Sequence, residues 1–260
     1  MYKFFLQDDF DYSLLGKPPV IFISDIDETY LQTDFKSLKG LCTAAVQFAV
    51  DKITYPDMSL FYRTVRRARA SALYFISSSP VQLRGIMLKK FLLEEVPCDG
   101  IVLRDTVRLV LAGHGDEVRN PFGYKLLAVL TLMKSFPRAS RLVFLGDDTE
   151  SDSAVYESIK ALADGSLGLG GLRGRLEERQ IHPDHVAQVL GELDDLPVRG
   201  FDVAGIFIRR TGHGTADSNP PQMGLSSIVF EHPRAIIEVL LSRGVITGEQ
   251  AAWFERRAVA

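Results

Sequence analysis

The sequence predicts an α/β protein built on a doubly wound, mainly parallel sheet of five to six strands. Short, continuous apolar runs recur along the chain, as expected for strands buried on both faces of a parallel sheet. Amphipathic stretches of helical period separate these runs. Because strand and helix alternate five times, we expect helices on both faces of the sheet, in a three-layer sandwich.

The first predicted strand, 20–23, follows Pro18 and Pro19 and consists of four apolar residues. Similar runs occupy 73–76, 101–103, 142–145 and 203–208, and a shorter sixth run occupies 228–230. Amphipathic helices are predicted at 58–70, 81–94, 124–136, 153–163 and 233–243. Most of these helices connect two successive strands, as the crossover of a parallel sheet requires.

Three polar segments interrupt this alternation. The connection 105–123 is longer than the roughly 2 to 6 residues usual between a strand and a helix. The segment 164–200 begins with a glycine cluster and continues with an acidic helical stretch at 185–193, and a third polar loop covers 212–224. The glycine cluster follows a helix rather than a strand, which disfavours a dinucleotide-binding turn and favours a flexible insertion. We therefore expect a single domain over 1–260, with an insertion at about 164–200 and a C-terminal strand-helix extension at about 225–260.

Composition excludes several classes of protein. The chain has 260 residues, of which 46% are apolar, so it can bury a full core. Thirty basic and 33 acidic residues give a net charge of −3, which provides no positive field for nucleic acid. No apolar run reaches the roughly 18 to 20 residues of a membrane span, and the first residues do not form a signal peptide. We expect a cytoplasmic protein without a transmembrane segment, and peripheral contact with a membrane surface stays open.

Polar side chains follow the predicted strands where each one ends. They are Asp25, Asp27 and Thr29 after the first strand, Ser77 and Ser78 after the second, Arg104 after the third, Asp147, Asp148 and Asp152 after the fourth, and Arg209 after the fifth. Ligands bind at the carboxyl ends of the strands in open parallel sheets, so these side chains mark the expected site. Crowded carboxylates require a cation or a proton, and a site made of oxygen ligands suits Mg²⁺. Ser77 and Lys125 add a hydroxyl donor and a positive charge, both suited to phosphate oxygens.

The order of these residues resembles the four motifs of the haloacid dehalogenase (HAD) superfamily of phosphohydrolases. The matching features are Asp-x-Asp-x-Thr at 25–29, Ser77, Lys125, and Gly-Asp at 146–147 followed by Asp152. More closely, the chain is similar to the catalytic domain of the fungal actin-patch phosphatidate phosphatase and its bacterial relatives. The pieces that carry this similarity lie at 23–29, 55–58, 60–63, 74–83, 102–105, 136–137, 145–147 and 206–209. The resemblance implies a HAD-like Rossmannoid sandwich with a minimal cap.

The resemblance also implies roles for individual residues. Asp25 would be the nucleophile that forms an aspartyl-phosphate, and Asp27 the acid and base that serves the leaving group and water. The phosphoryl group would be held by Thr29, Ser77, Ser78 and Lys125. Mg²⁺ would be held by Asp25, the backbone carbonyl of Asp27, Asp147 and Asp152.

The chain departs from the family pattern at three places. It has Glu28 where the family usually has Asp, Ser78 where it has Asn, and Asp148-Thr149-Glu150 where it has Ser-Gly-Gln. Asp148 could itself be a metal ligand, so the division of labour among Asp147, Asp148 and Asp152 stays open. Arg104 and Arg209 could bind substrate phosphate or pair with the carboxylates, and both readings stand.

The expected substrate is a phosphomonoester, and the resemblance implies phosphatidate or a related lipid phosphate. The connection between the first two strands is too short for a large cap, so we expect an open pocket. Basic residues at 63, 66, 67 and 69, with Lys89 and Lys90, can attract an anionic membrane, although a solvated face is the favoured reading. A soluble sugar or nucleotide phosphate, and a catalytically silent phosphate-binding scaffold, are the alternatives. Oligomeric state is not predicted.

Overall fold

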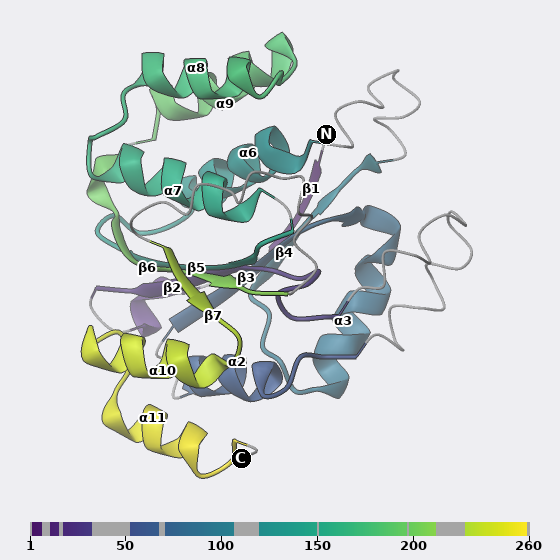
Figure 1. Cartoon of the computed structure of the whole chain (residues 1–260), viewed down its shortest axis with the longest axis vertical. Coiled ribbons are helices and arrows are strands. Elements are labelled where there is room, and N and C mark those ends of the chain that lie inside the picture. Colours follow the sequence, from purple (N-terminus) through teal and green to yellow (C-terminus); the bar gives the residue numbers. More distant parts are fainter. Residues whose placement is uncertain are drawn as a thin grey trace.

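A central sheet with helices on both faces forms the body of the protein (Figure 1). The structure is a computed structural model, and it describes residues 2–6, 11–15, 18–32, 53–67, 71–106, 120–149, 151–196, 198–211 and 227–258. The α/β class and the three-layer arrangement predicted from the sequence are confirmed.

Within these residues the sheet has seven strands in the order β1-β4-β3-β2-β5-β6-β7. The strands are β1 (Tyr2–Leu6), β2 (Val20–Asp25), β3 (Ser71–Pro80), β4 (Gly100–Arg104), β5 (Arg141–Asp147), β6 (Asp202–Arg209) and β7 (Ser227–Phe230). All neighbouring pairs are parallel except β1 and β4, which are antiparallel.

The sheet has one strand more than the sequence predicted. The additional strand is β1, which forms an edge of the sheet and pairs only with β4, from Tyr2 opposite Arg104 to Leu6 opposite Gly100. Its run of apolar residues is short, and its pairing with β4 is antiparallel, unlike the pairing of the predicted strands. The alternation that identified the parallel strands could therefore not identify it.

The helices of the described residues form two groups on opposite faces of the sheet (Figure 1). One face carries α6 (Pro121–Lys134) and α7 (Asp152–Ala163), with α8 (Leu169–Glu178) and α9 (Pro183–Asp194) outside them. The other face carries α2 (Met58–Arg66), α3 (Arg84–Leu93), α10 (Pro233–Ser242) and α11 (Gly248–Glu255). Short 3-10 helices lie at Tyr12–Leu14, Val81–Leu83 and Val198–Gly200.

The continuous apolar runs serve both faces of the sheet. In β2, Ile21 and Ile23 pack with α6 and α7, whereas Val20 and Phe22 pack on the side of α2 and α10. Successive side chains of a strand point to opposite faces, so a strand between two helical layers must be apolar at every position. The core consequently lies in two slabs, one on each side of the sheet.

Residues 164–200, expected to be a flexible insertion, instead contain a packed helical hairpin. Leu172 and Leu176 of α8, with Val186 and Val189 of α9, belong to the buried core on the α6 side. The Asn120 side-chain amide donates to the Arg179 carbonyl over 2.7 Å, which ties the turn of the hairpin to the start of α6. Gly170, Gly171 and Gly174 lie within α8, so the apolar residues at helical spacing determine this structure despite the glycines.

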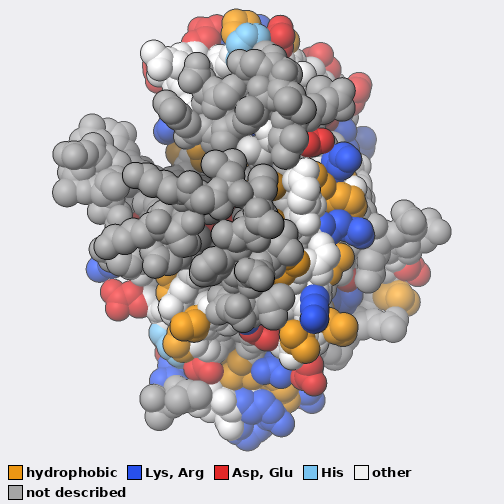
Figure 2. Space-filling model, turned by 90° about the vertical axis from the view of Figure 1, so that its right-hand side faces the viewer, with side chains coloured by type: hydrophobic (Ala, Val, Ile, Leu, Met, Phe, Trp, Pro, Cys, Tyr) orange, Lys and Arg blue, Asp and Glu red, His pale blue; other side chains and the backbone are white. Residues whose placement is uncertain are grey.

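The basic run on α2 is largely paired within the protein. Arg66 forms a 2.7 Å ion pair with buried Asp99, Arg63 pairs with Glu95 at 3.0 Å, and Arg67 lies 3.7 Å from Glu249. Arg69 lies outside the described residues. On the described part of the face in Figure 2, Lys and Arg side chains lie among acidic and hydrophobic ones. Among the helices that are described, none has both the length and the hydropathy needed to cross a membrane.

The carboxyl ends of the parallel strands meet at one edge of the sheet. The chain leaves β2 toward β3 and β4 on one side, and later returns to place β5, β6 and β7 on the other side. Such a reversal of strand order opens a crevice beside the central strand, where ligands of α/β proteins bind. The predicted site residues therefore lie where this fold provides a binding position.

Candidate active site

Three buried carboxylates meet at the carboxyl ends of β2 and β5. Asp25 ends β2, Asp147 ends β5, and Asp152 begins α7. One carboxylate oxygen of each lies within 4.8 Å of the others, and each residue is at most 2% exposed. All the donors are hard oxygens, which is the ligand type that Mg²⁺ prefers. The residues present thus fit the divalent cation that the sequence predicts.

Lys125 is buried against this carboxylate cluster. Its Nζ donates to Asp25 Oδ1 over 2.8 Å and to Asp152 Oδ1 over 2.5 Å. The lysine lies one turn into α6, a helix that begins with Asn120 as its N-cap and Pro121 in its first turn. One ammonium cannot balance three ionised carboxylates, and buried like charges are costly without a counter-ion. The electrostatics of the cluster therefore favour a bound cation.

Gly146 allows α7 to approach the end of β5. A Cβ at this position would lie 2.4 Å from the Asp152 Cβ and 2.6 Å from its Oδ2. The same Oδ2 accepts a hydrogen bond from the Asp147 backbone N–H over 3.2 Å. The glycine before Asp147 is thus required by the close contact between strand and helix.

Asp148 points away from the carboxylate cluster. Its Oδ1 accepts hydrogen bonds from the Thr211 N–H over 3.1 Å and the Thr211 hydroxyl over 2.7 Å. In contrast, Asp147 Oδ1 accepts from the Thr149 N–H over 2.6 Å and from its hydroxyl. Of the five aspartates predicted at the metal, Asp25, Asp147 and Asp152 come together, whereas the side chains of Asp27 and Asp148 lie outside that group.

Asp27 is oriented by two serine hydroxyls from β3. Its Oδ2 accepts from Ser77 Oγ over 3.0 Å and from Ser79 Oγ over 2.8 Å. Ser78, predicted at the phosphate, lies between them in the strand and is partly buried. Ser79 follows the same predicted strand but was not among the predicted site residues, although the two-residue period of a strand places it on the same side as Ser77.

The turn after β2 brings Asp25 and Asp27 into place. The N–H groups of Tyr30 and Leu31 both donate to the Ile26 carbonyl over 2.9 Å, and Glu28 has a φ of 57°. The Glu28 carboxylate accepts from the Tyr55 hydroxyl over 2.7 Å, and burial is the main cause that raises the Tyr55 pKa above its ordinary value. The left-handed residue closes a tight turn between the two aspartates and Leu31.

Thr29, predicted at the phosphate, is fully buried behind this turn. Its Oγ1 has no hydrogen-bond partner among the described residues. Its carbonyl oxygen accepts from Arg209 Nε over 3.1 Å. Thr29 therefore contacts Arg209 of β6 through its backbone carbonyl.

Arg209 holds the backbone of the turn. Besides the Thr29 carbonyl, its Nη1 donates to the Glu231 carbonyl over 2.7 Å. The guanidinium carbon lies 4.1 Å from the ring centre of Tyr55 and 4.7 Å from that of Phe230. Burial lowers the Arg209 pKa to about 10, so the group stays protonated at neutral pH. The side chain thus joins the turn, β6 and the end of β7.

Arg104 ends β4 and packs against Tyr124 of α6. It is 1% exposed, and its guanidinium lies 5.1 Å from the ring centre of Tyr124 in α6. The Tyr124 hydroxyl donates to the Ser77 carbonyl over 2.8 Å. Arg104 therefore supports the strand that carries Ser77 and Ser79.

A family model for the catalytic domain of phosphatidate phosphatase APP1 matches residues 20–167, more than half of the chain. The chain belongs to this family. The resemblance stated from the sequence motifs is thereby confirmed. Searches of curated proteins and of solved structures gave no match.

The phosphatidate phosphatase APP1 match runs from the start of β2 to the loop after α7. It includes the three clustered aspartates, Lys125 and the serines of β3, and it ends before α8. The family name describes the hydrolysis of a lipid phosphomonoester, so a phosphatase is the enzyme class that the match supports.

Proposed function

We propose that this chain hydrolyses a lipid phosphomonoester, phosphatidate or a close relative, with the help of Mg²⁺ and through an aspartyl-phosphate on Asp25. The observation that carries the proposal is the buried group of Asp25, Asp147, Asp152 and Lys125 inside the stretch matched by the phosphatase family. We also propose that the protein is a HAD-type phosphatase and that it is cytoplasmic, at the periphery of a membrane.

Asp25, Asp147 and Asp152 would hold Mg²⁺, which would supply positive charge for the phosphate oxygens. An Asp25 carboxylate oxygen attacks phosphorus, and the bond from phosphorus to the ester oxygen breaks. Lys125 keeps its ammonium beside the attacking group, where it favours the ionised carboxylate and offsets charge on the phosphoryl group. The products of this first step are diacylglycerol and the aspartyl-phosphate of Asp25.

Asp27 moves the protons. Its Oδ2 accepts two serine hydroxyl bonds, so a proton carried by Asp27 sits on Oδ1. That proton passes to the leaving ester oxygen. The resulting carboxylate then takes a proton from water, which attacks the aspartyl-phosphate, breaks the bond from phosphorus to Asp25 and releases inorganic phosphate.

The test measures phosphate release from dispersed phosphatidate and p-nitrophenyl phosphate, with and without Mg²⁺. We expect turnover by the unmodified protein only with the metal, and none by Asp25→Asn. We expect Asp27→Asn to lose roughly 10²- to 10⁴-fold on phosphatidate. Acid-quenched Asp27→Asn should carry one phosphoryl group on Asp25, as measured by mass spectrometry.

Full activity of Asp25→Asn would overturn the nucleophile assignment. Metal-dependent release from soluble esters alone would keep the chemistry and reject the lipid. Tight phosphatidate binding without any turnover would favour a phosphate-binding scaffold.

A further inference from the structure

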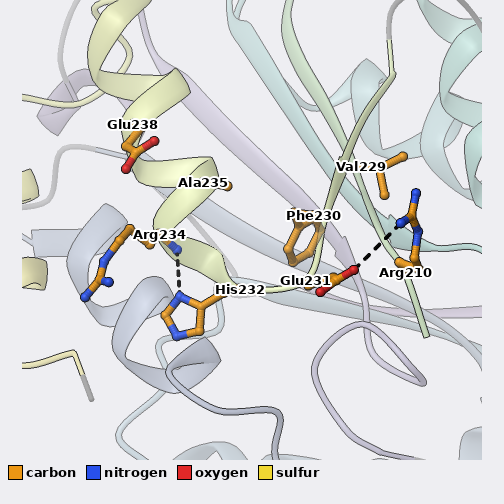
Figure 3. A pocket seen from close by; sticks show the side chains of 8 residues that line it. All are labelled: Arg210, Val229, Phe230, Glu231, His232, Arg234, Ala235 and Glu238. Carbon is orange, nitrogen blue, oxygen red and sulfur yellow. Dashed lines mark hydrogen bonds and ion pairs between the residues drawn. The ribbon is translucent and has the colours of Figure 1, made fainter. Parts of the chain in front are cut away.

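A groove runs along the carboxyl ends of β6 and β7, beside the carboxylate cluster. It consists of two adjoining pockets of about 340 and 500 Å³, which share Arg210, Glu231 and His232. The smaller pocket also includes Tyr55, Pro56 and Thr211, and the larger is closed by the first turn of α10 (Figure 3). We call this the β6–β7 groove.

The β6–β7 groove begins one strand away from the catalytic residues. Arg209 lines the groove and lies opposite Asp147 in the register of β5 and β6. Neighbouring strands lie about 4.8 Å apart. Thr211 in its wall is bonded to Asp148. A substituent that extends from the reacting phosphorus toward β6 would therefore enter the groove directly.

The His232 side of the groove is held in place before any ligand arrives. His232 Nδ1 accepts from the Arg234 N–H over 3.2 Å, so its Nε2 carries the proton and donates to Asp57 Oδ2 over 3.0 Å. Both ring nitrogens are used, and Figure 3 shows the ring at the foot of α10. A side chain fixed in this way loses little conformational entropy when the groove binds a ligand.

The lining suits a neutral ligand that has both apolar and hydrogen-bonding parts. Val229, Phe230 and Ala235 line the larger pocket with apolar atoms, and Figure 3 shows Phe230 between Ala235 of α10 and Val229 of β7. Arg210 has a 57% exposed side chain, and its Nη1 lies 3.8 Å from a Glu231 carboxylate oxygen, an ion pair beyond hydrogen-bond distance. Its N–H donors can reach ester carbonyl oxygens.

The acidic side chains of the groove disfavour a second anionic group on the ligand. Glu231 and Glu238 both line the larger pocket, and Glu231 is 74% exposed at its side chain. The nearby Arg234 is engaged with Glu255 at 3.1 Å. A leaving group that carries a further phosphate would meet these carboxylates, whereas a glycerol diester would not.

We propose that the β6–β7 groove binds the neutral glycerol diester of the substrate, and that Arg210 is a specificity-determining residue that donates to an ester carbonyl. This inference rests on the proposed function, because it gives the binding position of the leaving group in the same reaction. It also explains how the site would prefer a lipid phosphate to a nucleotide.

The test compares kcat/KM for a short-chain phosphatidate below its micellar concentration with kcat/KM for p-nitrophenyl phosphate. Ala235→Trp fills the groove, and Arg210→Ala removes its donors. We expect each to lower the ratio of the two kcat/KM values about tenfold or more, mainly through KM for phosphatidate, in line with the loss of one well-placed contact. Ala252→Trp, on an exposed position of α11 outside the groove, should leave the ratio unchanged.

A second measurement does not depend on turnover. Binding of short-chain phosphatidate to Asp25→Asn, measured by calorimetry, should weaken about tenfold or more when Arg210→Ala is added. Unchanged ratios and unchanged binding, or a parallel loss on both substrates, would overturn the groove. If Ala235→Trp does not fold, Arg210→Ala decides alone. Absence of turnover in the unmodified protein would instead reject the proposed function.

Discussion

Arg209 contacts two backbone carbonyls and two aromatic rings, and so fixes the turn that carries Asp27. Arg209→Met keeps much of the side-chain volume and removes the hydrogen bonds. We expect the turn to loosen and Asp27 to protonate the leaving oxygen less well, because small misplacements of a catalytic group are costly. Phenyl phosphate, with a basic leaving group, should then lose more kcat than p-nitrophenyl phosphate. Steady-state kinetics on the two small esters checks this.

A matched control is Arg243→Met. Arg243 also donates to a backbone carbonyl, that of Ala204 over 2.7 Å, but it lies near the amino end of β6. This variant should affect both esters equally. Equal losses in Arg209→Met would show that Arg209 acts on stability alone, and a rise in KM alone would show that it binds substrate.

Gly146 leaves room for Asp152, so the packing of β5 against α7 and the position of a catalytic carboxylate both depend on it. In Gly146→Ala the new methyl group would collide with Asp152, so α7 must move. We expect a loss of about 1 to 3 kcal/mol in the free energy of unfolding. Phosphatase activity should fall about 100-fold, since Asp152 would leave Lys125 and the Asp147 N–H.

Urea denaturation and phosphate release measure the two effects of Gly146→Ala. Gly191→Ala is the control, because an added Cβ in that exposed helix position contacts nothing within 4 Å. It should not lower stability, since alanine is the better helix former. Wild-type activity in Gly146→Ala would mean that the contact between Gly146 and Asp152 does not matter for catalysis.

At the residue scale, the sequence could predict which polar groups gather, but not how each one points. The ends of parallel strands meet at one edge, which was enough to place Asp25 and Asp147 together, whereas Lys125 lies on a helix and was assigned from the order of the family motifs. The outward turn of Asp148 depends on Thr211, and the contact of Arg209 depends on the Thr29 carbonyl. Both partners lie far away in the sequence, and no local pattern encodes such pairings.

At the element scale, Glu94 connects α3 to the segments around it. Its carboxylate accepts from the hydroxyls of Tyr30, Thr54 and Ser59 and pairs with Lys90 at 2.7 Å. Burial alone would raise the Glu94 pKa, but the bonds from Lys90, Ser59, Thr54 and Tyr30 outweigh it and lower the pKa. The end of α3 is thus anchored to the start of α2 and to the turn after β2.

Because its pKa is lowered in the folded state, Glu94 stabilises the fold above the pKa of the unfolded chain, about 4.5. That contribution is lost as the pH falls through the folded pKa. We expect Glu94→Gln to cost about 1 to 3 kcal/mol at pH 7, the range for hydrogen bonds to a charged group. The difference from wild type should shrink below about pH 4.5.

Thermal unfolding between pH 7 and pH 3 measures this dependence. Glu95→Gln is the control, since the neighbouring Glu95 side chain is 76% exposed and makes a surface pair with Arg63. Exposed ion pairs contribute little, so this variant should unfold close to wild type at every pH. A pH-independent difference for Glu94→Gln would reject the role of its charge.

Elements were predictable from the sequence where a helix separates two strands, and less so elsewhere. Six strands followed from their apolar runs, whereas β1 depends on pairing with β4 at the opposite end of a long connection. The helical stretch predicted at 185–193 lies in α9, whereas α8 was obscured by glycines, although Leu172 and Leu176 already show the helical spacing. The glycine-rich composition at the start of 164–200 suggested a flexible insertion, whereas packing on the α6 side of the core determines the structure of this segment.

At the scale of the whole molecule, folding forces three carboxylates into one buried site. A cation that binds only the folded state should stabilise it, by about 2.7 kcal/mol at a free concentration 100 times its Kd. We expect Mg²⁺ to raise the Tm, and Asp147→Asn to abolish that rise. Calorimetric unfolding with and without Mg²⁺ checks it without any assay of turnover.

Asp148→Asn separates the two adjacent aspartates in the same experiment. Since Asp148 is bonded to Thr211 and lies outside the clustered group, this variant should keep the Mg²⁺-dependent rise in Tm. Loss of the rise in Asp148→Asn would make Asp148 a ligand. No rise in the unmodified protein would argue against a structural Mg²⁺ site.

The boundary of the family match at residue 167 separates two kinds of structure. The elements before it carry the aspartates and the lysine, and the elements after it, β6, β7 and α10, form most of the proposed groove. Apart from Arg209, which holds the turn of Asp27, changes in the second part can therefore alter which ester is accepted without disturbing bond cleavage. Relatives that share the first part would then differ in substrate through changes in β6, β7 and α10 alone, while the residues that cleave the phosphate ester stay the same.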